Sequence, residues 1–295
     1  MTKKTREWLT TAPSFLWLTL LLLVPTILVL AIAFKPADPL GGIGKGWTFS
    51  TIRSLSIPSY PAIIMRTLWQ GLATTAICIV LSIPMAYYMA RTSEKCRHFL
   101  MVLTIVPFWV WFVVRVFAWK YLLHPDGFIR HSLLWLGVID ADTFLLYSPA
   151  TVLLVMVYNH LPFAILPIFA AAEKFDYQLF EAAQDLGSTR FRAFMEIFLP
   201  GIKTGIITAI LMVLIPALGE YVIPDMVGGV DSEMIGSKIA QRTFADKNLP
   251  HACALSAFLI FIVLIPMIAV IFHRDKKGKG GLTGDASRRV KGVIS

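Results

Sequence analysis

Six long apolar segments constrain this chain more than any other feature of its sequence. They cover residues 13–34, 67–90, 99–120, 149–172, 201–223 and 252–272. Each has about 20 residues or more, enough for a helix to cross the roughly 30 Å hydrocarbon core of a bilayer. Runs such as Leu20–Val24 lack the alternation of membrane-spanning strands. The sequence therefore predicts an all-α, polytopic membrane helix bundle with six transmembrane helices.

The composition supports an integral membrane protein. Hydrophobic residues make up 57% of the chain and charged residues 15%, whereas soluble domains carry about 25% charged residues. The mean hydropathy is +0.70. The three cysteines lie far apart and show neither a metal-site spacing nor a disulfide framework. We expect no metal site, and we attribute the net charge of +9 to membrane topology rather than to nucleic-acid binding.

Lys and Arg are unevenly distributed among the segments that connect the apolar runs. With the N-terminus inside, the inner segments hold 17 and the outer segments 9, although the outer loop 35–66 holds four of these. Because cytoplasmic loops are enriched in Lys and Arg, both termini are predicted to be cytoplasmic. The first run follows basic residues, as in a secretory signal. At 22 residues it exceeds a signal's apolar core of about 7–15 residues, and we expect a retained helix.

This orientation places a polar, helix-forming insert at residues 173–200 in the cytoplasm. Its first part has apolar residues at helical spacing, namely Tyr177, Phe180 and Ala183. Gly187 suits the left-handed position that ends a helix, and we expect Ser188 to cap a second helix. The second helix is predicted to have an apolar face formed by Phe191, Phe194, Ile197 and Phe198. Two interpretations stay open: an amphipathic connector on the membrane surface, or a docking element for a groove on a partner.

The insert also carries a spaced signature. The order Glu181-Ala182-Ala183, three residues, Gly187, nine residues, Ile197, one residue, Leu199-Pro200 resembles the EAA signature of type I permease subunits of binding-protein-dependent ABC importers. The likeness covers residues 61–272 and leaves 1–60 as an N-terminal region and 273–295 as a basic cytoplasmic tail. Further segments resemble the spermidine/putrescine permeases, closest to the putrescine-system permease: 133–140, 219–229 and 234–236.

The resemblance implies a polyamine importer in the bacterial inner membrane. Its other parts are a second permease subunit, a dimer of cytoplasmic ATPase subunits and an extracytoplasmic solute-binding protein. In the family, the EAA loop docks as a coupling helix in a cleft of the ATPase. Carried over to this chain, the coupling residues are Glu181, Ala182, Ala183, Asp185, Leu186, Gly187, Ile197, Leu199 and Pro200.

Nucleotide chemistry is not expected in this chain. The sequence lacks the G-x-x-x-x-G-K-[ST] pattern that cradles nucleotide phosphates. We therefore expect no catalytic residues and no bound cofactor, with ATP and Mg²⁺ held by the partner ATPase.

Candidate solute contacts follow from polar and aromatic residues at membrane depth. A carboxylate there is costly, so Glu220 either faces a wet path, where it meets an ammonium group with Asp225, or is already paired or interfacial. Tyr158, Trp109 and Trp111 are candidates for cation–π contact with an alkyl diamine, but interfacial Trp and Tyr are common in membrane proteins.

Three other polar residues lie in apolar segments. We expect Arg115 to snorkel toward the outer surface, and Asn159 and His160 to form interhelical hydrogen bonds.

Other functional classes are less well supported. A membrane enzyme would need clustered catalytic groups, and no metalloprotease or nucleophile-elbow spacing is present. An ABC permease for another small solute is a closer alternative. A secondary transporter or a channel has no need of an EAA loop.

Overall fold

Helices make up most of the residues that the computed structural model describes, which are 3–38, 41–56, 59–140 and 144–264. Within these ranges no strand forms, and a single isolated bridge pairs Ala37 with Ile43. The predicted all-α fold is confirmed. The chain divides into two compact units, Met1–Leu55 with Asp246–Ser295, and Ser56–Ala245.

The first unit contains two apolar helices. Helix α1 (Lys3–Ala33) includes the membrane-length stretch Thr11–Ala33, in which Ala33 alone is buried. A second apolar helix covers Leu249–Leu264. The short helix α2 (Ser50–Arg53) follows α1 at a distance and is continued by the 3₁₀ turn η1 (Ser54–Ser56).

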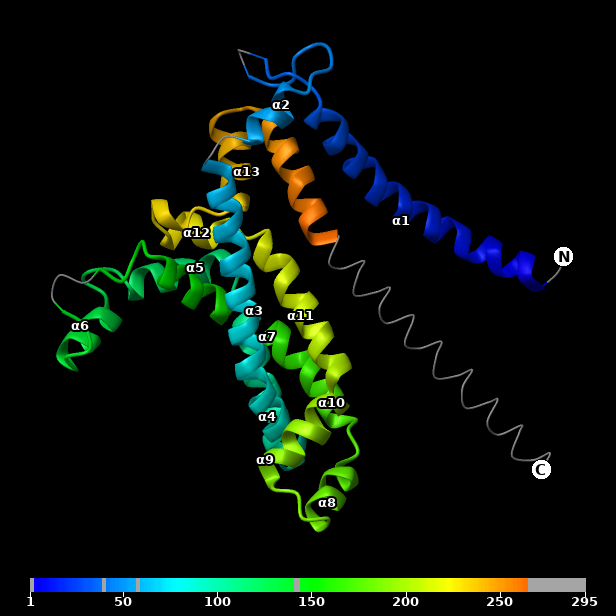
Figure 1. Cartoon of the computed structure of the whole chain (residues 1–295), viewed down its shortest axis with the longest axis vertical. Helices are drawn as coiled ribbons and strands as arrows, with labels where there is room; N and C mark the ends of the chain where they lie inside the picture. Colours follow the sequence, from blue (N-terminus) through cyan, green and yellow to red (C-terminus); the bar gives the residue numbers. More distant parts are fainter. Residues whose placement is uncertain (1–2, 39–40, 57–58, 141–143, 265–295) are drawn as a thin grey trace. The chain divides into compact units, whose positions relative to one another are not determined.

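The second unit is built on three helices: α3 (Ser59–Arg91), α7 (Pro149–Glu173) and α11 (Lys203–Leu218). They pack against one another along their lengths (Figure 1). One face of α3 is buried at helical spacing, through Thr67, Gln70, Thr74, Cys78, Ser82, Ala86 and Met89. Helix α11 comes close to α7 at Gly205, where an added Cβ would lie 2.5 Å from Ala171 Cβ. Small residues permit such close helix approach in membranes.

The third apolar segment, predicted as one helix over 99–120, is broken. Helix α4 (Glu94–Ile105) runs into the 3₁₀ turn η2 (Val106–Trp109), and α5 (Phe112–Leu122) begins after two non-helical residues. The two parts are bent by 91°. Pro107 lies at the bend, and its ring and missing N–H interrupt a helix.

The fifth segment also differs from its prediction over 201–223. The helical stretch Arg190–Gly201 bends by 69° into α11, and α11 ends at Leu218, two residues after Pro216. A separate short helix, α12 (Val222–Val227), follows.

The predicted number of six spanning helices is not confirmed. Among the described residues three helices are long and apolar enough to cross a membrane, or up to five if each bent pair counts as one span. The sixth predicted segment lies partly, and the basic tail 273–295 wholly, outside the described residues.

The remaining short elements lie at the ends of the three-helix core. At one end are α8 (Tyr177–Asp185), α9 (Arg190–Ala193), the π-helical η3 (Phe194–Phe198) and α10 (Leu199–Gly201). At the other are α12, the 3₁₀ turn η4 (Val230–Ser232), α13 (Ile235–Ala240) and the π-helical η5 (Gln241–Ala245) (Figure 1). Helix α6 (Phe128–Trp135) confirms the short amphipathic helix that the sequence predicts for residues 128–137.

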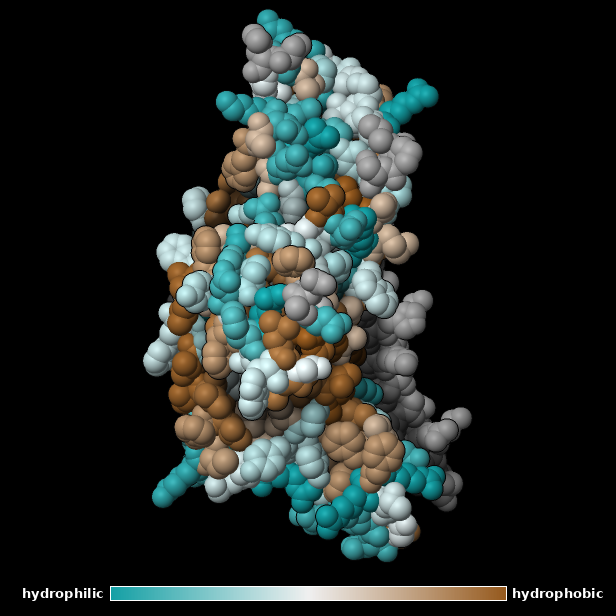
Figure 2. Space-filling view, turned by 90° about the vertical axis from the view of Figure 1, so that its left-hand side faces the viewer, coloured by the Kyte–Doolittle hydropathy of each residue, from teal (hydrophilic) through white to brown (hydrophobic). Residues whose placement is uncertain are grey.

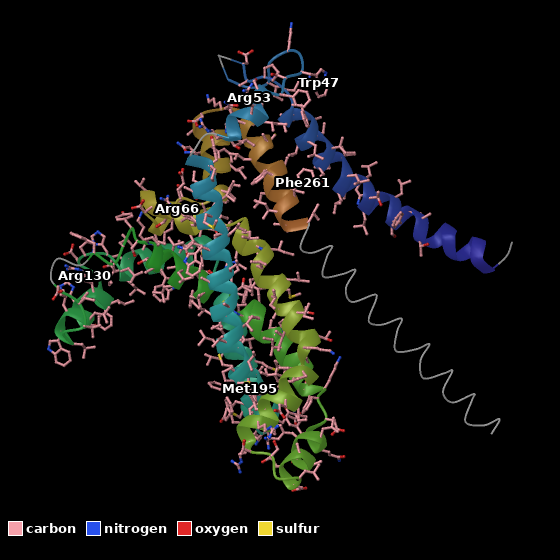
Figure 3. The ribbon with its side chains drawn as sticks, viewed as in Figure 1. Trp47, Arg53, Arg66, Arg130, Met195 and Phe261 are labelled. Carbon is pink, nitrogen blue, oxygen red and sulfur yellow. The ribbon has the colours of Figure 1, made fainter. Side chains whose placement is uncertain are left out.

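The polarity of the surface differs between the middle and the α8–α9 end of the three-helix core. Figure 2 shows hydrophobic residues gathered in the middle of the visible face and hydrophilic residues at the lower end, where α8 and α9 lie. Met195 lies at this end, whereas Arg66 lies toward the opposite end of α3 (Figure 3).

Candidate functional site

Helix α8 is closed at both ends by local hydrogen bonds. Asp176 Oδ1 accepts from the Gln178 N–H at 3.0 Å and caps its first turn. At the other end Gly187 adopts a φ of +90°, which confirms the predicted left-handed position. The N–H groups of Gly187 and Ser188 donate to the Gln184 and Ala183 carbonyl groups at 2.9 and 3.0 Å. This is the Schellman arrangement, which turns the chain sharply after the helix.

The predicted cap of the second helix is wrong by one residue. Because the Ser188 N–H completes the end of α8, the next residue starts α9: Thr189 Oγ1 accepts from the Arg192 N–H at 3.3 Å. The second helix is also not a plain α-helix. It changes to π-helical geometry over Phe194–Phe198 before Pro200 is reached.

An aromatic cluster fastens the α8–α10 unit to the core. Tyr87 of α3 lies at its centre, with ring centroids 5.0 Å from Phe198, 5.4 Å from Phe194 and 6.1 Å from Phe180. Phe180 and Phe198 are buried. Edge-to-face aromatic pairs at this spacing each contribute about 0.5–1.5 kcal/mol beyond the area they bury. The cluster therefore couples the position of the unit to that of α3.

Arg91, in the last turn of α3, covers this cluster. Its guanidinium carbon lies 5.3 Å from the Tyr87 ring centre and 5.5 Å from that of Tyr177, and its Nη1 donates to the Tyr87 hydroxyl. Burial raises the pKa of the Tyr177 phenol to about 12, although the nearby Arg91 opposes this. Tyr177 is therefore neutral at physiological pH.

The opposite face of the unit is open and partly apolar. Leu186 is 90% exposed and Phe191 70% exposed. The predicted apolar face of the second helix is divided, because Phe191 is exposed whereas Phe198 is buried. The residues of the signature divide between the two faces. Exposed are Glu181, Ala182, Asp185, Leu186, Gly187 and Pro200, and half-buried are Ala183, Ile197 and Leu199.

A cavity of about 570 Å³ opens between α8 and the end of α3. Its charged lining residues are Arg91, Glu181 and Arg190, beside the aromatic rings of Tyr87 and Tyr88. Sequence reasoning missed Arg91 and Tyr87. A basic residue at the end of an apolar segment, four residues after a tyrosine, was the available signal.

The predicted solute residues Glu220 and Asp225 lie around the start of α12. Glu220 Oε1 accepts from the N–H groups of Tyr221, Val222 and Ile223 at 3.1, 3.0 and 3.3 Å. Asp225 is exposed and lines a cavity of about 410 Å³ together with Glu233.

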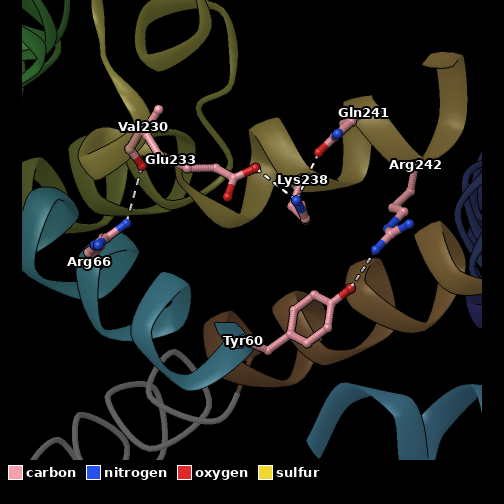
Figure 4. A network of polar contacts seen from close by, with 7 residues as sticks. All are labelled: Tyr60, Arg66, Val230, Glu233, Lys238, Gln241 and Arg242. Carbon is pink, nitrogen blue, oxygen red and sulfur yellow. Dashed lines mark hydrogen bonds and ion pairs between the residues drawn. The ribbon is translucent and has the colours of Figure 1, made fainter. Parts of the chain in front are cut away.

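Ionic and polar contacts hold this end of the core together (Figure 4). Lys238 Nζ donates to Glu233 Oε1 at 3.0 Å and to Gln241 Oε1 at 2.9 Å. Arg66 Nη1 donates to the Val230 carbonyl at 3.3 Å, and Arg242 Nη2 to the Tyr60 hydroxyl at 3.2 Å. The contacts of Arg66 and Arg242 link the 230–242 segment to the first turns of α3, whereas those of Lys238 lie within the segment.

The aromatic candidates do not surround a single cavity with the carboxylates. Tyr158 packs on Trp119 with ring centroids 5.3 Å apart and lines a separate, apolar cavity of about 230 Å³ among α3, α4 and α7. Trp109 and Trp111 flank the break before α5 and are 82% and 76% exposed.

Two predictions for polar residues of the apolar segments are wrong. Asn159 Nδ2 donates to the Val155 carbonyl at 2.9 Å, and His160 Nδ1 lies 2.8 Å from the Met156 carbonyl, so both bonds are within α7 rather than between helices. Arg115 does not snorkel to the surface; it is buried.

Comparisons with known proteins agree on one family. The family described as "Binding-protein-dependent transport system inner membrane component" matches residues 78–277. The chain is 32% identical to the spermidine/putrescine transport system permease protein PotB of Escherichia coli, over 84% of this chain and 90% of that protein. It is 32% identical to PotB of Haemophilus influenzae, over 91% and 93%. It is 33% identical to the inner membrane ABC transporter permease protein YdcU of Escherichia coli, over 77% and 75%.

Solved structures show the same fold. A chain of a bacterial ABC transporter involved in the import of the acidic polysaccharide alginate superimposes with a TM-score of 0.67 at 20% identity, covering 92% of this chain and 96% of that one.

Proposed function

Since the chain belongs to the family of inner membrane components of binding-protein-dependent transport systems, we propose that it translocates a polyamine, putrescine or spermidine. An external binding protein delivers the polyamine, and a separate ATPase drives the step. The names of the relatives support the polyamine, since several are spermidine/putrescine permeases. The chain contributes the path and performs no chemistry itself.

The proposal that an ATPase drives transport rests on the α8–α10 unit, which has one face packed on α3 and one face exposed. Its inner face is held to α3 by the aromatic cluster around Tyr87. Its outer face presents exposed apolar side chains, Leu186 and Phe191, and the exposed carboxylate of Glu181 lies at the open cavity between α8 and the end of α3. Apolar anchors beside a charge are typical of a helix that docks in a groove on a partner. This favours the docking interpretation over a passive connector.

An ATPase that docks at this face can move the helices of the core. When the ATPase subunits move, the cluster transmits the displacement of α8 to α3, and α11 follows from Pro200 through α10. Ala182 leaves room for close approach, and Glu181 offers a carboxylate to a basic residue of the ATPase. Rocking of packed helices around a central path then alternates access.

The solute side is the opposite end of the core. With both termini in the cytoplasm, α12 and α13 face the exterior, where Asp225 and Glu233 line one cavity. Glu233 is paired with Lys238, so Asp225 is the carboxylate that can raise the local concentration of ammonium groups at this entrance. We assign Asp225 to the first contact with the solute, with Glu220 behind it.

Competition for uptake in cells that carry the whole system tests the solute. Labelled putrescine is the reporter, and unlabelled diamines, triamines and amino acids are the competitors. We expect the diamine and triamine to compete and the amino acids not to. Competition by an amino acid but by no polyamine would show that the solute is not a polyamine, and the proposed role as a permease would still stand.

A further inference from the structure

Arg115 is a buried cation whose side chain has no hydrogen-bond acceptor among the described residues. It lies in the first turn of α5, and 8% of its surface is exposed. Within the described part of the chain, its Nε and Nη1 atoms are buried and have no acceptor. The guanidinium carbon lies 5.3 Å from the Phe108 ring centre and 5.8 Å from that of Phe112. These rings face the cation but are not ordinary hydrogen-bond acceptors. Nη2 is not among the buried atoms and has no acceptor among the described residues either, so it is the donor that a group of another molecule can reach.

The apolar segments of the chain provide no free carboxylate for this cation. Of the 18 acidic residues in the chain, only Glu220 falls within the six apolar segments. Glu220 already accepts three backbone N–H bonds at the start of α12. The two apolar helices of the other unit, Thr11–Ala33 and Leu249–Leu264, contain no Asp or Glu. Among the described residues no carboxylate forms an ion pair with Arg115, which leaves this cation open to a carboxylate of another molecule.

The chain around Arg115 also needs cover. Val110 and Trp111 have non-helical dihedral angles and lie exposed at the break between η2 and α5. Irregular backbone at membrane depth occurs where protein covers it or where it lines a water-filled cavity, and not against lipid. The exposed side chains next to the break are large and apolar, namely Trp109, Trp111, Val114 and Phe117. Such a surface suits a protein helix better than water.

From these observations we propose that the second permease subunit packs on the η2–α5 face and places a carboxylate against Arg115. The inference rests on the proposed function, since it assumes a second permease. An ionic contact of this kind, shielded from water, fixes the register of the two subunits at the bend of α4 and α5. Breaking it leaves one charge buried and unpaired, which is strongly unfavourable.

The test uses the complete complex, purified through a tag on this chain. In Arg115→Gln the guanidinium is replaced by a neutral side chain, and Lys120→Gln makes the same change of charge one turn and a half further along α5. We expect Arg115→Gln to lower the recovery of the second permease about tenfold or more, with an equal amount of this chain in the membrane. Lys120→Gln is expected to recover it as the unchanged chain does.

A photo-crosslinking amino acid at Val114 in the otherwise unchanged chain gives a second measurement that does not depend on the folding of a variant. Val114 is exposed beside Arg115, and we expect an adduct with a membrane segment of the second permease. Normal recovery with Arg115→Gln, or adducts with lipid or the binding protein alone, would overturn the proposal. If the unchanged chain recovers no second permease and no ATPase, the proposed function itself fails.

Discussion

Glu220 and Arg115 are charged residues of the apolar segments, and their side chains differ in how their hydrogen-bonding groups are satisfied. Glu220 is satisfied locally, because three consecutive backbone N–H groups converge on one of its oxygens. Arg115 is buried among aromatic rings with donors unused in the described part of the chain. The sequence shows that both charges are energetically costly at membrane depth, but it does not show which of them is satisfied by hydrogen bonds within the chain. The difference depends on where α11 ends and α12 begins, and α11 stops five residues before the predicted boundary.

Removing the Glu220 side chain should destabilise the start of α12. Glu220→Ala leaves three N–H groups without their acceptor, and we expect a loss of about 1–3 kcal/mol in the free energy of unfolding. Glu220→Gln keeps an oxygen acceptor and should lose less. Thermal unfolding of the purified protein measures both, with Asp225→Ala as an exposed control. Equal stability of the Ala and Gln variants would show that the cap contributes little.

The Gln variant also separates structure from transport. If Glu220 is a contact for the solute, Glu220→Gln lowers polyamine uptake while the complex assembles normally. Uptake kinetics measured beside the recovery of the complex decide this. Unchanged kinetics would leave Glu220 as a helix cap only.

Tyr177 and Tyr87 form a matched pair of hydroxyl groups in one cluster. The Tyr177 hydroxyl is buried and has no partner among the described residues, whereas that of Tyr87 accepts from Arg91. With a pKa near 12, Tyr177 is neutral, so Tyr177→Phe removes no charge. We expect Tyr177→Phe to leave stability unchanged or raised, and Tyr87→Phe to lose about 1 kcal/mol. Denaturant unfolding checks the order, and the reverse order would contradict the assigned contacts.

At the scale of elements, the helices and their turns were predictable to different degrees. The left-handed Gly187 and the short helix α6 follow from local patterns, and the structure has both. The 91° bend after Pro107 did not follow, because a proline is also tolerated inside membrane helices such as α7, which contains two. The burial of Phe198 rather than Phe191 did not follow either. It depends on π-helical geometry, which rotates the later residues relative to a regular helix.

Gly187 offers a direct test of the α8–α9 turn. Gly187→Asp places a side chain in a left-handed conformation on the proposed docking face, and we expect transport to be lost while the chain still inserts. Gly137 is a matched control, since it has a φ of +69° and the same pair of closing hydrogen bonds at the end of α6.

An added Cβ meets no atom within 4 Å at either glycine. The strain is therefore the same, and only the location differs. Equal loss of uptake in Gly187→Asp and Gly137→Asp would show that strain, and not docking, is responsible. Full transport by Gly187→Asp would contradict the coupling role.

The close contact between α7 and α11 makes a further prediction. A Cβ at Gly205 would lie 2.5 Å from Ala171 Cβ and 2.7 Å from the Pro167 carbonyl oxygen. We expect Gly205→Ala to lower the free energy of unfolding by about 1–3 kcal/mol. Gly219→Ala is the control, because its Cβ meets only the Pro216 carbonyl, at 3.8 Å. Equal melting temperatures for the two variants would contradict the packing.

At the scale of the whole molecule, the two ends of the core have different tasks in the proposed mechanism. The α8–α10 end takes up motion from the ATPase, and the α12–α13 end meets the solute. Length and hydropathy were enough to predict a helical membrane protein, and the spaced signature led to its family. The solute residues could not be identified in this way, since they depend on loop geometry and on partner surfaces that one chain does not contain.

Uptake by the complete complex in proteoliposomes tests the ATP-driven role most directly. Labelled putrescine and the binding protein are supplied on the outside, and ATP, ADP or a proton gradient is supplied separately. We predict accumulation with ATP alone among these, and its loss in Gly187→Asp but not in Gly137→Asp. Accumulation driven by the proton gradient without ATP would contradict the ATPase-coupled mechanism and indicate a secondary transporter.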